Sequence, residues 1–288
     1  MTEDPFVAHR GLLFTIAYEM LGSAADAEDV LQESWLRWAA VDHAQVREPR
    51  AYLVRIVTRQ ALNRLRTLSR SREEYVGEWL PEPLLTAPDV AEDVELAESV
   101  SIAMLTVLET LGPTERAVFV LREVFDMPYG EIAEAVGKSA ATVRQIGRRA
   151  REHVAARRPR TRVSRSEQRA VVGRFLAALR NGQVAELMEV LAPDVVLIAD
   201  GGGIVNAVRA PVHGAELVTR LLARADAVAA DFTTTTVYLN GAPAGRVEIG
   251  GELTAISLAV EGGRVTHVYI MRNPRKLTRL EEPAELAR

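Results

Sequence analysis

The chain has 288 residues, of which 48% are hydrophobic and 26% charged, and it contains no cysteine. This composition suits two or three small folded domains, and the lack of cysteine excludes disulfides and thiolate metal sites. The sequence has no apolar run of about 18 residues, and its acidic N-terminus does not resemble a signal peptide, so we expect a cytoplasmic protein with no membrane partner.

The net charge of −4 hides a separation of acidic and basic residues along the chain. Nine acidic residues and no Lys or Arg occur from residue 73 to 98, whereas eleven basic and two acidic residues occur from residue 138 to 169. Opposite blocks of this kind indicate one part that binds a polyanion and another that imitates or repels one.

Residues 1–72 are predicted to form a first helical domain. After a capping-box-like start at Ser23, one helix has an apolar face composed of Ala27, Val30, Leu31, Ser34, Trp35 and Trp38. A second helix is predicted from Pro49 to about Leu65, with a polar stripe composed of Arg55, Arg59, Asn63 and Arg66. The stripe by itself is a weak signal, since a charged helix face is usually just solvated.

Residues 73–96 are predicted to form an acidic linker. Pro81, Pro83 and Pro88 forbid a continuous helix and favour an extended segment. Trp79 and Leu80 are unusual in a freely solvated tether, so we expect this linker to pack against something.

Residues 97–157 are predicted to form a second helical domain that contains a helix-turn-helix. A short helix from Tyr129 to Val136 is followed by Gly137 as a stop, by Ser139 as an N-cap, and by a helix from about 140 to 156. The outward side chains of that helix are Thr142, Arg144, Gln145, Arg148 and Arg149. Arg and Gln can bind guanine and adenine edges in the major groove, which favours DNA binding over a merely solvated helical hairpin.

Residues 164–288 are predicted to form an α+β domain. Two helices, the first capped at Ser164, precede a change to period-two patterning with many β-branched residues. Strands are predicted at Val195–Ala199, Phe232–Leu239, Leu253–Val260 and Val265–Met271, with a hairpin turn at Gly262–Gly263 and a helix at Gly214–Ala225. The pattern therefore predicts a curved antiparallel sheet with helices packed on it.

Several segments resemble extracytoplasmic-function (ECF) RNA polymerase sigma factors over about residues 5 to 157. Asp26–Arg37 resembles their polymerase-binding helix and Pro49–Ile56 the start of their −10-reading helix, while Gly112–Arg116 and Met127–Ala133 resemble their −35-binding domain. The resemblance implies two all-α sigma domains that bind core RNA polymerase and promoter DNA. Many family members have Asn where Arg59 stands and Asp where Asn63 stands, which leaves the −10 preference open.

The resemblance also implies roles for individual residues. Contacts with polymerase are implied for Asp29, Gln32, Glu33 and Leu36. Contacts with the −10 element are implied for the stripe that runs from Arg55 to Arg66, and contacts with the −35 element for Ser139, Thr142, Arg144, Gln145, Arg148 and Arg149.

The C-terminal domain resembles a SnoaL-like cone-shaped fold, which indicates the SigJ-like subgroup of ECF factors. The resemblance rests on three short motifs, which are Trp79-Leu80-Pro81-Glu82-Pro83, Asp200-Gly201-Gly202-Gly203 and Asn273-Pro274-Arg275-Lys276-Leu277. It implies that Trp79 to Pro83, Asp200 to Gly203, Asn273, Pro274, Lys276 and Leu277 hold the extension against the sigma domains. The extension would then modulate activity without a separate anti-sigma factor. The family usually has Asp where Arg275 stands.

Other functions remain open at this point. The extension could be a SnoaL-type enzyme with Asp200 as general base, or a sensor with a small-ligand pocket, and the chain could be a simple repressor. His213 and His267 are the other acid–base groups of the extension, and no nucleophile–base set or metal triad is visible. We therefore predict a sigma factor that is not an enzyme and needs no cofactor or metal.

Overall fold

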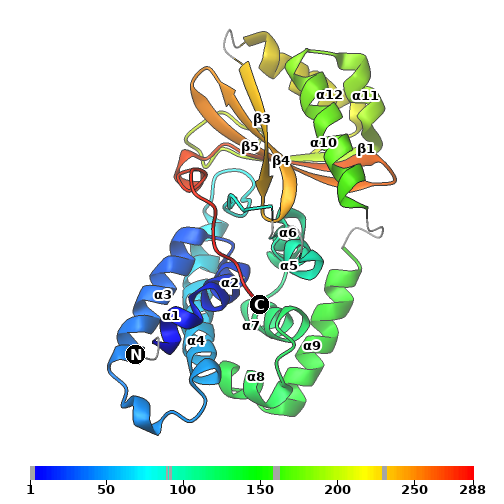
Figure 1. The fold of residues 1–288 in the computed structure, drawn as a ribbon. Coiled ribbons are helices and arrows are strands. Elements are labelled where there is room, and N and C mark those ends of the chain that lie inside the picture. The colour runs from blue at the N-terminus through cyan, green and yellow to red at the C-terminus, as the bar shows by residue number, and fades with distance from the viewer. Residues whose placement is uncertain (1–3, 89, 91–92, 158–162, 229–231) are drawn as a thin grey trace.

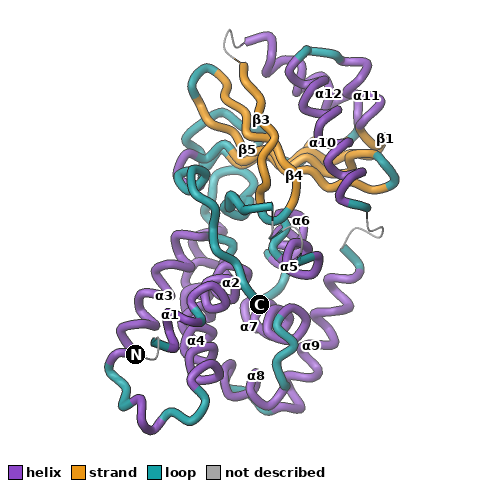
Figure 2. The backbone as a smooth tube through the Cα atoms, viewed as in Figure 1, coloured by secondary structure: helices purple, strands orange, loops and turns teal. Residues whose placement is uncertain are grey.

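The structure is a computed structural model that describes residues 4–88, 90, 93–157, 163–228 and 232–288. The helices of the N-terminal half form one part of the molecule, and a sheet with its own helices forms the other (Figure 1). Loop segments of the linker and of the C-terminal tail lie between these two parts (Figure 2). The predicted architecture, two helical units followed by an α+β unit, is confirmed.

The first helical unit consists of α1 (Pro5–Ala8), α2 (Arg10–Leu21), α3 (Ala24–Ala39) and α4 (Pro49–Glu73), with a 3₁₀ turn at His43–Gln45. Helix α2 is central, because all of its residues from Leu12 to Leu21 are buried and it packs on both α3 and α4. Ser23 caps α3 as predicted, and its Oγ accepts a hydrogen bond from the Asp26 N–H at 3.2 Å.

Two predictions for this unit are wrong. Helix α4 continues to Glu73 rather than ending near Leu65, because residues 66–73 contain no Gly or Pro and need no apolar face to stay helical. Trp35, predicted on the buried face of α3, is 45% exposed. It lies at the edge of that face, and Trp38 one turn later fills the core instead.

The second helical unit consists of α5 (Val94–Ser99), α6 (Ile102–Leu108), α7 (Pro113–Phe119), a π-helical turn at Val120–Val124, α8 (Tyr129–Val136) and α9 (Ala140–Ala155). Helix α8 ends at Gly137 in the left-handed conformation, with φ of 69°. The helix-turn-helix therefore has the bounds predicted for it. Helix α5 begins inside the predicted linker, because the Asp93 carboxylate caps it by accepting from Glu95 and Leu96 N–H groups at 3.1 and 2.9 Å.

The C-terminal unit consists of α10 (Arg165–Arg180), α11 (Val184–Val190), α12 (Ala215–Val228), β1 (Leu191–Asp200), β2 (Val212–His213), β3 (Phe232–Leu239), β4 (Ala242–Ile249), β5 (Glu252–Glu261) and β6 (Arg264–Met271), followed by a 3₁₀ turn at Pro274–Lys276. The six strands form one sheet in the order β2-β1-β6-β5-β4-β3. Helices α10, α11 and α12 lie together against this sheet (Figure 1). The predicted turn at Gly262 and Gly263 joins β5 to β6, and both glycines have positive φ.

The sheet differs from the prediction in three respects, one of which is the unpredicted two-residue strand β2. Strands β1 and β6 pair in parallel, so the sheet is not wholly antiparallel. Strand β4 was not predicted, because Ala, Pro and Gly at residues 242–245 are poor strand formers. It forms because β3 and β5 pair with it on both sides.

Three hydrophobic clusters organise the molecule. One joins the two helical units, one fills the C-terminal unit between its sheet and helices, and one lies at the seam between the helical part and the sheet. The seam cluster includes Leu80 from the linker, Ile102 from α6, and Leu239 and Met271 from the sheet, each at most 1% exposed. In the described part of the chain, no helix has the length and apolar character to cross a membrane.

Candidate functional site

Helix α9 presents the row of side chains that was predicted to face DNA. Val143, Ile146 and Ala150 are buried and fix the orientation of the helix. Ser139 caps it and accepts from the Thr142 N–H at 3.2 Å. On the opposite side, the predicted row is exposed, and it consists of Thr142, Arg144, Gln145, Arg148 and Arg149. The row is therefore accessible to solvent, with Arg148 hydrogen-bonded to Glu152 and Arg144 over the Tyr129 ring.

The polar stripe of α4, in contrast, is partly covered by the helix-turn-helix. The Arg55 guanidinium lies 3.3 Å from the carboxylate of Glu134 on α8, and Arg59 donates to the Glu134 carbonyl oxygen at 2.8 Å. Asn63 further along the stripe is exposed. Sequence reasoning did not single out Glu134, because nothing in the local pattern pairs it with a helix about 75 residues earlier.

Helix α3 presents the four side chains predicted to meet polymerase. Asp29, Gln32, Glu33 and Leu36 are all exposed, and Leu36 is 59% exposed beside the exposed Trp35. Two of the acidic side chains are held by α4, since Arg64 lies 3.3 Å from the Asp29 carboxylate and Gln60 donates to Glu33 at 2.7 Å. Exposed apolar side chains beside oriented acids suit a protein partner.

The three motifs of the linker and extension meet at the Asp200 carboxylate, which is completely buried. Its Oδ1 accepts from the Tyr75 hydroxyl at 2.7 Å and from the Gly202 N–H at 2.9 Å. Its Oδ2 accepts from the Leu80 N–H at 2.9 Å and forms an ion pair with Lys276 at 2.7 Å. One carboxylate therefore joins the linker, the end of β1 and the chain after β6.

Side chains around Asp200 complete this contact. Asn273 donates from its amide to the Tyr75 hydroxyl at 2.8 Å, and the Lys276 ammonium lies 3.9 Å from the centre of the Trp79 ring. Gly202 needs to be glycine, because its φ is 62° and a Cβ there would lie 2.3 Å from the Asn273 amide. Burial of Tyr75 and its hydrogen bond to Asp200 raise the pKa of the tyrosine above its usual value.

The rest of the linker is held by the first helical unit and by the β3–β4 turn. Glu82 is buried and accepts from the Ala24 and Ala25 N–H groups at 2.8 and 3.2 Å, so it caps α3 from outside. The Tyr18 hydroxyl donates to the Glu82 carbonyl oxygen at 2.7 Å and accepts from the Asn240 amide at 2.6 Å. Asn240 lies in the turn between β3 and β4, and its amide also donates to the Val100 carbonyl oxygen at 2.8 Å.

A buried carboxyl group lies where α2 meets α5 and α7. Glu19 is completely buried and accepts from the Ser99 hydroxyl at 2.7 Å, while the Arg116 guanidinium donates to the Glu19 carbonyl oxygen at 2.9 Å. Arg116, itself buried, also pairs with Glu109. Burial raises the pKa of Glu19 to about 8, although Ser99 and Arg116 act in the opposite direction.

The C-terminal tail crosses from the sheet to the first helical unit (Figure 1). Its Ala284 N–H donates to the Leu85 carbonyl oxygen at 2.8 Å, and its Ala287 N–H donates to the Thr15 hydroxyl at 3.0 Å. The last residue, Arg288, forms an ion pair with Glu95 of α5. The tail therefore contacts the linker, α2 and α5.

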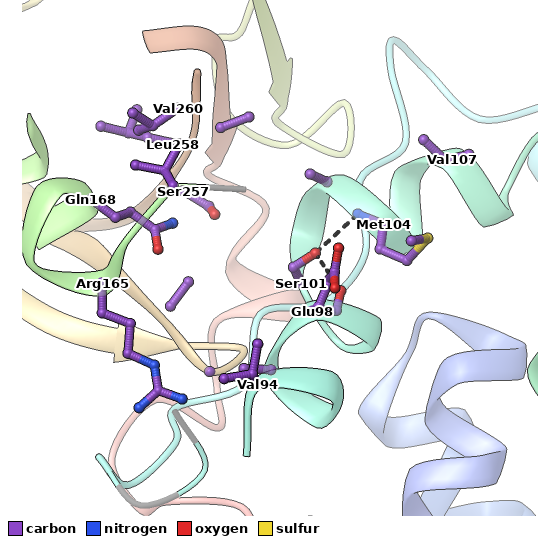
Figure 3. A pocket seen from close by; sticks show the side chains of 16 residues that line it. Val94, Glu98, Ser101, Met104, Val107, Arg165, Gln168, Ser257, Leu258 and Val260 are labelled. Carbon is purple, nitrogen blue, oxygen red and sulfur yellow. Dashed lines mark hydrogen bonds between the residues drawn. The ribbon is translucent and has the colours of Figure 1, made fainter. Parts of the chain in front are cut away.

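A cavity of about 230 Å³ lies at the seam between α5–α6 and the extension. Figure 3 shows Gln168 and Ser257 of the extension facing Glu98 and Ser101 across it. The Ser101 hydroxyl donates to the Glu98 carbonyl oxygen at 2.8 Å and accepts from the Met104 N–H at 3.2 Å, so it caps α6. The seam is thus tightly packed around Leu80 and more open here.

The residues considered for catalysis do not come together. The Asp200 carboxylate is engaged by four donors at the linker and does not line the cavity inside the C-terminal unit. His213 is exposed. His267 is half-buried against Tyr269, and burial lowers the pKa of its imidazole. Asp200 therefore has a structural position rather than that of a general base in a pocket.

Comparison with known proteins agrees with this arrangement. The chain matches the family model Sigma-70 region 2 over residues 6–71 and the model Sigma-70, region 4 over residues 101–154. The two helical units are thus those of a sigma-70-type factor. The ECF RNA polymerase sigma factor SigJ of Mycobacterium tuberculosis is 36% identical over 298 residues, which cover 96% of this chain and 94% of that protein.

One further relative and a crystal structure of SigJ also match nearly the whole chain. A probable ECF RNA polymerase sigma factor of Mycobacterium tuberculosis, SigI, is 31% identical over 94% of this chain and 92% of its own length. The crystal structure of Mycobacterium tuberculosis SigJ has a TM-score of 0.77 at 32% identity, covering 96% of this chain and 98% of that one. The chain therefore belongs to the ECF RNA polymerase sigma factors, which are transcription initiation factors.

Proposed function

We propose that this chain binds core RNA polymerase and directs it to promoters with separate −35 and −10 elements, and that its C-terminal domain restrains this activity in place of an anti-sigma factor. Helix α9 would read the −35 element through Thr142, Arg144, Gln145, Arg148 and Arg149. The stripe on α4 would contact the −10 element, and the exposed residues of α3 would contact polymerase. This proposal includes the predicted domain boundaries, with sigma domains at residues 1–72 and 97–157 and the extension at 164–288. It also includes the predicted cytoplasmic location.

One observation carries the proposal of restraint. Arg55 and Arg59, two residues of the predicted −10 stripe, contact Glu134 of the helix-turn-helix, so a carboxylate and a carbonyl oxygen occupy guanidinium groups that could otherwise bind DNA phosphates. The α9 row stays exposed in the same arrangement. In this proposal, the docked chain would bind the −35 element while its −10 surface is partly occupied by Glu134.

Contacts of the extension with the linker and the helical units support the proposed restraint. Asp200 and Asn240 fix the linker, which connects the two helical units, and the C-terminal tail contacts α2 and α5. Release of the −10 surface would require the helical units to separate. Their shared hydrophobic cluster opposes this separation, and these contacts of the extension add to it. A docked and an extended form with different affinities for polymerase and promoter DNA would make this a switch.

A reversible crosslink tests the proposal on the full chain. A Cβ placed on Gly11 of α2 would lie 3.3 Å from the Cβ of Ala287, close to the separation found in disulfides. The chain has no native cysteine. The double variant Gly11→Cys, Ala287→Cys should form one disulfide that fixes the tail on α2, with Gly11→Cys alone as the control.

The readout is promoter-specific transcription with core polymerase, before and after reduction. The oxidised double variant should give several-fold less transcript than its reduced form, and its affinity for a duplex carrying only the −35 element should not change. Equal transcription by the oxidised and reduced forms would contradict the proposed restraint. Absence of any complex between core polymerase and the reduced protein would contradict the proposed activity itself.

A further inference from the structure

Tyr129, the first residue of α8, is a half-buried aromatic residue that packs against α9. Its ring contacts the hydrophobic cluster of the helical units. It also lies over Gly147 of α9, where an added Cβ would be 3.6 Å from the ring carbon Cε1 and 3.5 Å from Val118. The missing side chain at Gly147 therefore gives the ring room to lie directly on the recognition helix, and the core holds it there.

Two guanidinium groups lie near this ring. Arg122 is 5.1 Å and Arg144 is 5.7 Å from the ring centre, both within the range of a cation–π contact. Arg122 is also tied to the turn before α8, because it pairs with the Asp126 carboxylate at 2.9 Å and donates to the Met127 carbonyl oxygen at 3.0 Å. Arg122 is therefore committed to contacts within its own domain.

Arg144 of α9 is held in a different way. Its side chain is exposed, and among the residues that the structure describes it has the Tyr129 ring as a neighbour but no hydrogen bond or ion pair. A contact with an aromatic ring restricts a guanidinium but uses none of its five N–H donors. Arg144 is thus oriented while its donors stay available to a ligand.

The other arginines of the exposed row lack this combination. Arg148 donates to the Glu152 carboxylate at 3.2 Å, and the described part of the chain gives Arg149 neither a ring contact nor an ion pair. Arg144 also lies nearer the beginning of α9, which starts at Ala140. In helix-turn-helix complexes, this end of the recognition helix contacts the base edges. Arg144 is therefore the arginine of the row that is best prepared to read a base.

We propose that Tyr129 is a positioning residue, which holds Arg144 for a bidentate contact with the O6 and N7 atoms of a guanine in the −35 element. This inference rests on the proposed function, in which α9 reads that element. Guanine offers two acceptors in the major groove that match two donors of one guanidinium. An arginine already restricted by a ring loses less conformational freedom when it binds, so Tyr129 adds to base discrimination through Arg144.

The test begins with the full native chain and a pool of random-sequence DNA duplexes, from which the bound sequences are selected. Discrimination is then measured as the ratio of the affinities for the selected duplex and for the same duplex with adenine in place of one guanine. Arg144→Ala should lower this ratio about tenfold at one guanine, the effect of losing a bidentate contact. Tyr129→Leu should lower it about two- to fivefold at the same guanine, the effect of an exposed cation–π contact. Tyr129→Phe keeps the ring and should leave the ratio unchanged.

A matched control is available in the extension, where Arg169 lies 5.4 Å from the centre of the Tyr238 ring. Tyr238→Leu removes this second tyrosine–arginine contact and should leave the discrimination unchanged. In the Arg144→Ala background, Tyr129→Leu should not lower the discrimination further, because its effect acts through Arg144.

Three results would overturn the inference. If Tyr129→Leu lowers the affinity for all duplexes alike, and does so in the Arg144→Ala background as well, Tyr129 only supports the fold. If Tyr129→Leu leaves the discrimination at its native value, the ring does not position Arg144. In both cases the native protein still selects a sequence, so −35 reading by α9 stands. If the native protein selects no sequence at all, −35 reading by α9 fails, and the role of Tyr129 fails with it.

Discussion

Replacing Asp200 by Asn should loosen the contact between the extension and the linker. The native carboxylate is fully buried and accepts from Tyr75, Gly202, Leu80 and Lys276. An Asn side chain has one acceptor oxygen, so its NH₂ group would face two of these donors in either orientation. The Lys276 ammonium, 11% exposed, would lose its counter-charge.

The magnitude follows from the burial of the ion pair. Removal of one partner from a buried pair costs about 3–5 kcal/mol, because the remaining charge stays desolvated without the opposite charge that compensated it. Asp200→Asn should therefore lower the free energy of unfolding by about 3–5 kcal/mol, or by the full free energy of docking if the extension separates first. The double variant Asp200→Asn, Lys276→Met should have a free energy of unfolding closer to that of the native protein than Asp200→Asn alone has, because both charges are then removed.

Urea unfolding followed by circular dichroism measures the decrease in the free energy of unfolding. Hydrogen exchange at the Leu80 N–H shows whether the decrease arises at the contact around Asp200. The matched control is Asp194→Asn on the same strand, whose side chain is exposed and whose effect should stay within about 0.5 kcal/mol. If Asp200→Asn and Asp194→Asn have the same urea midpoint and the same Leu80 exchange, the buried carboxylate does not hold the seam and the reasoning is refuted.

Two further predictions concern charges at the domain contacts. Glu134→Gln should change the free energy of unfolding by less than about 1 kcal/mol, because the pair with Arg55 is exposed. The substitution should raise the affinity of the protein for a −10 DNA fragment a few-fold at low salt, as measured by filter binding. The role given to Glu134 is contradicted if the affinity does not rise, or if the rise does not depend on salt concentration. Glu19 has a pKa raised by burial to about 8, above its unfolded value of about 4.3. The folded protein therefore holds a proton that the unfolded chain releases, so stability should fall as pH rises from about 4.3 to 8, by at most about 1.4 kcal/mol per pH unit. Glu19→Gln should flatten this slope in urea titrations between pH 5 and 8, and an unchanged slope would show that another group titrates.

Local patterns predicted the parts of the structure that local interactions determine. The helix-turn-helix follows from a cap at Ser139, a left-handed Gly137 and the helical spacing of Val143, Ile146 and Ala150, all within a short stretch of sequence. Strand β4 could not be predicted in this way, because its residues become a strand only between two neighbours.

The contacts at the seam were beyond local reasoning. Tyr75 and Asp200 are 125 positions apart, and Tyr18 and Asn240 are 222 apart. The family resemblance pointed to the motif that contains Asp200, but neither the resemblance nor any pattern pointed to Tyr18, Tyr75, Asn240 or Glu134. Such partners depend on how whole units dock, and single-sequence periodicity carries no information on docking.

The composition of the seam determines how docking can be reversible. Its apolar cluster is small, and the groups that define its geometry are polar: Asp200, Glu82 and Asn240, each buried and each hydrogen-bonded. Water can replace these hydrogen bonds when the seam opens, so separation costs far less than it would for an apolar interface of the same area. Each larger core lies mainly on one side of the seam, although Ala284 and Leu286 of the C-terminal tail pack on the core of the helical units. In the proposed switch, these polar contacts would set how readily the extension leaves the sigma domains.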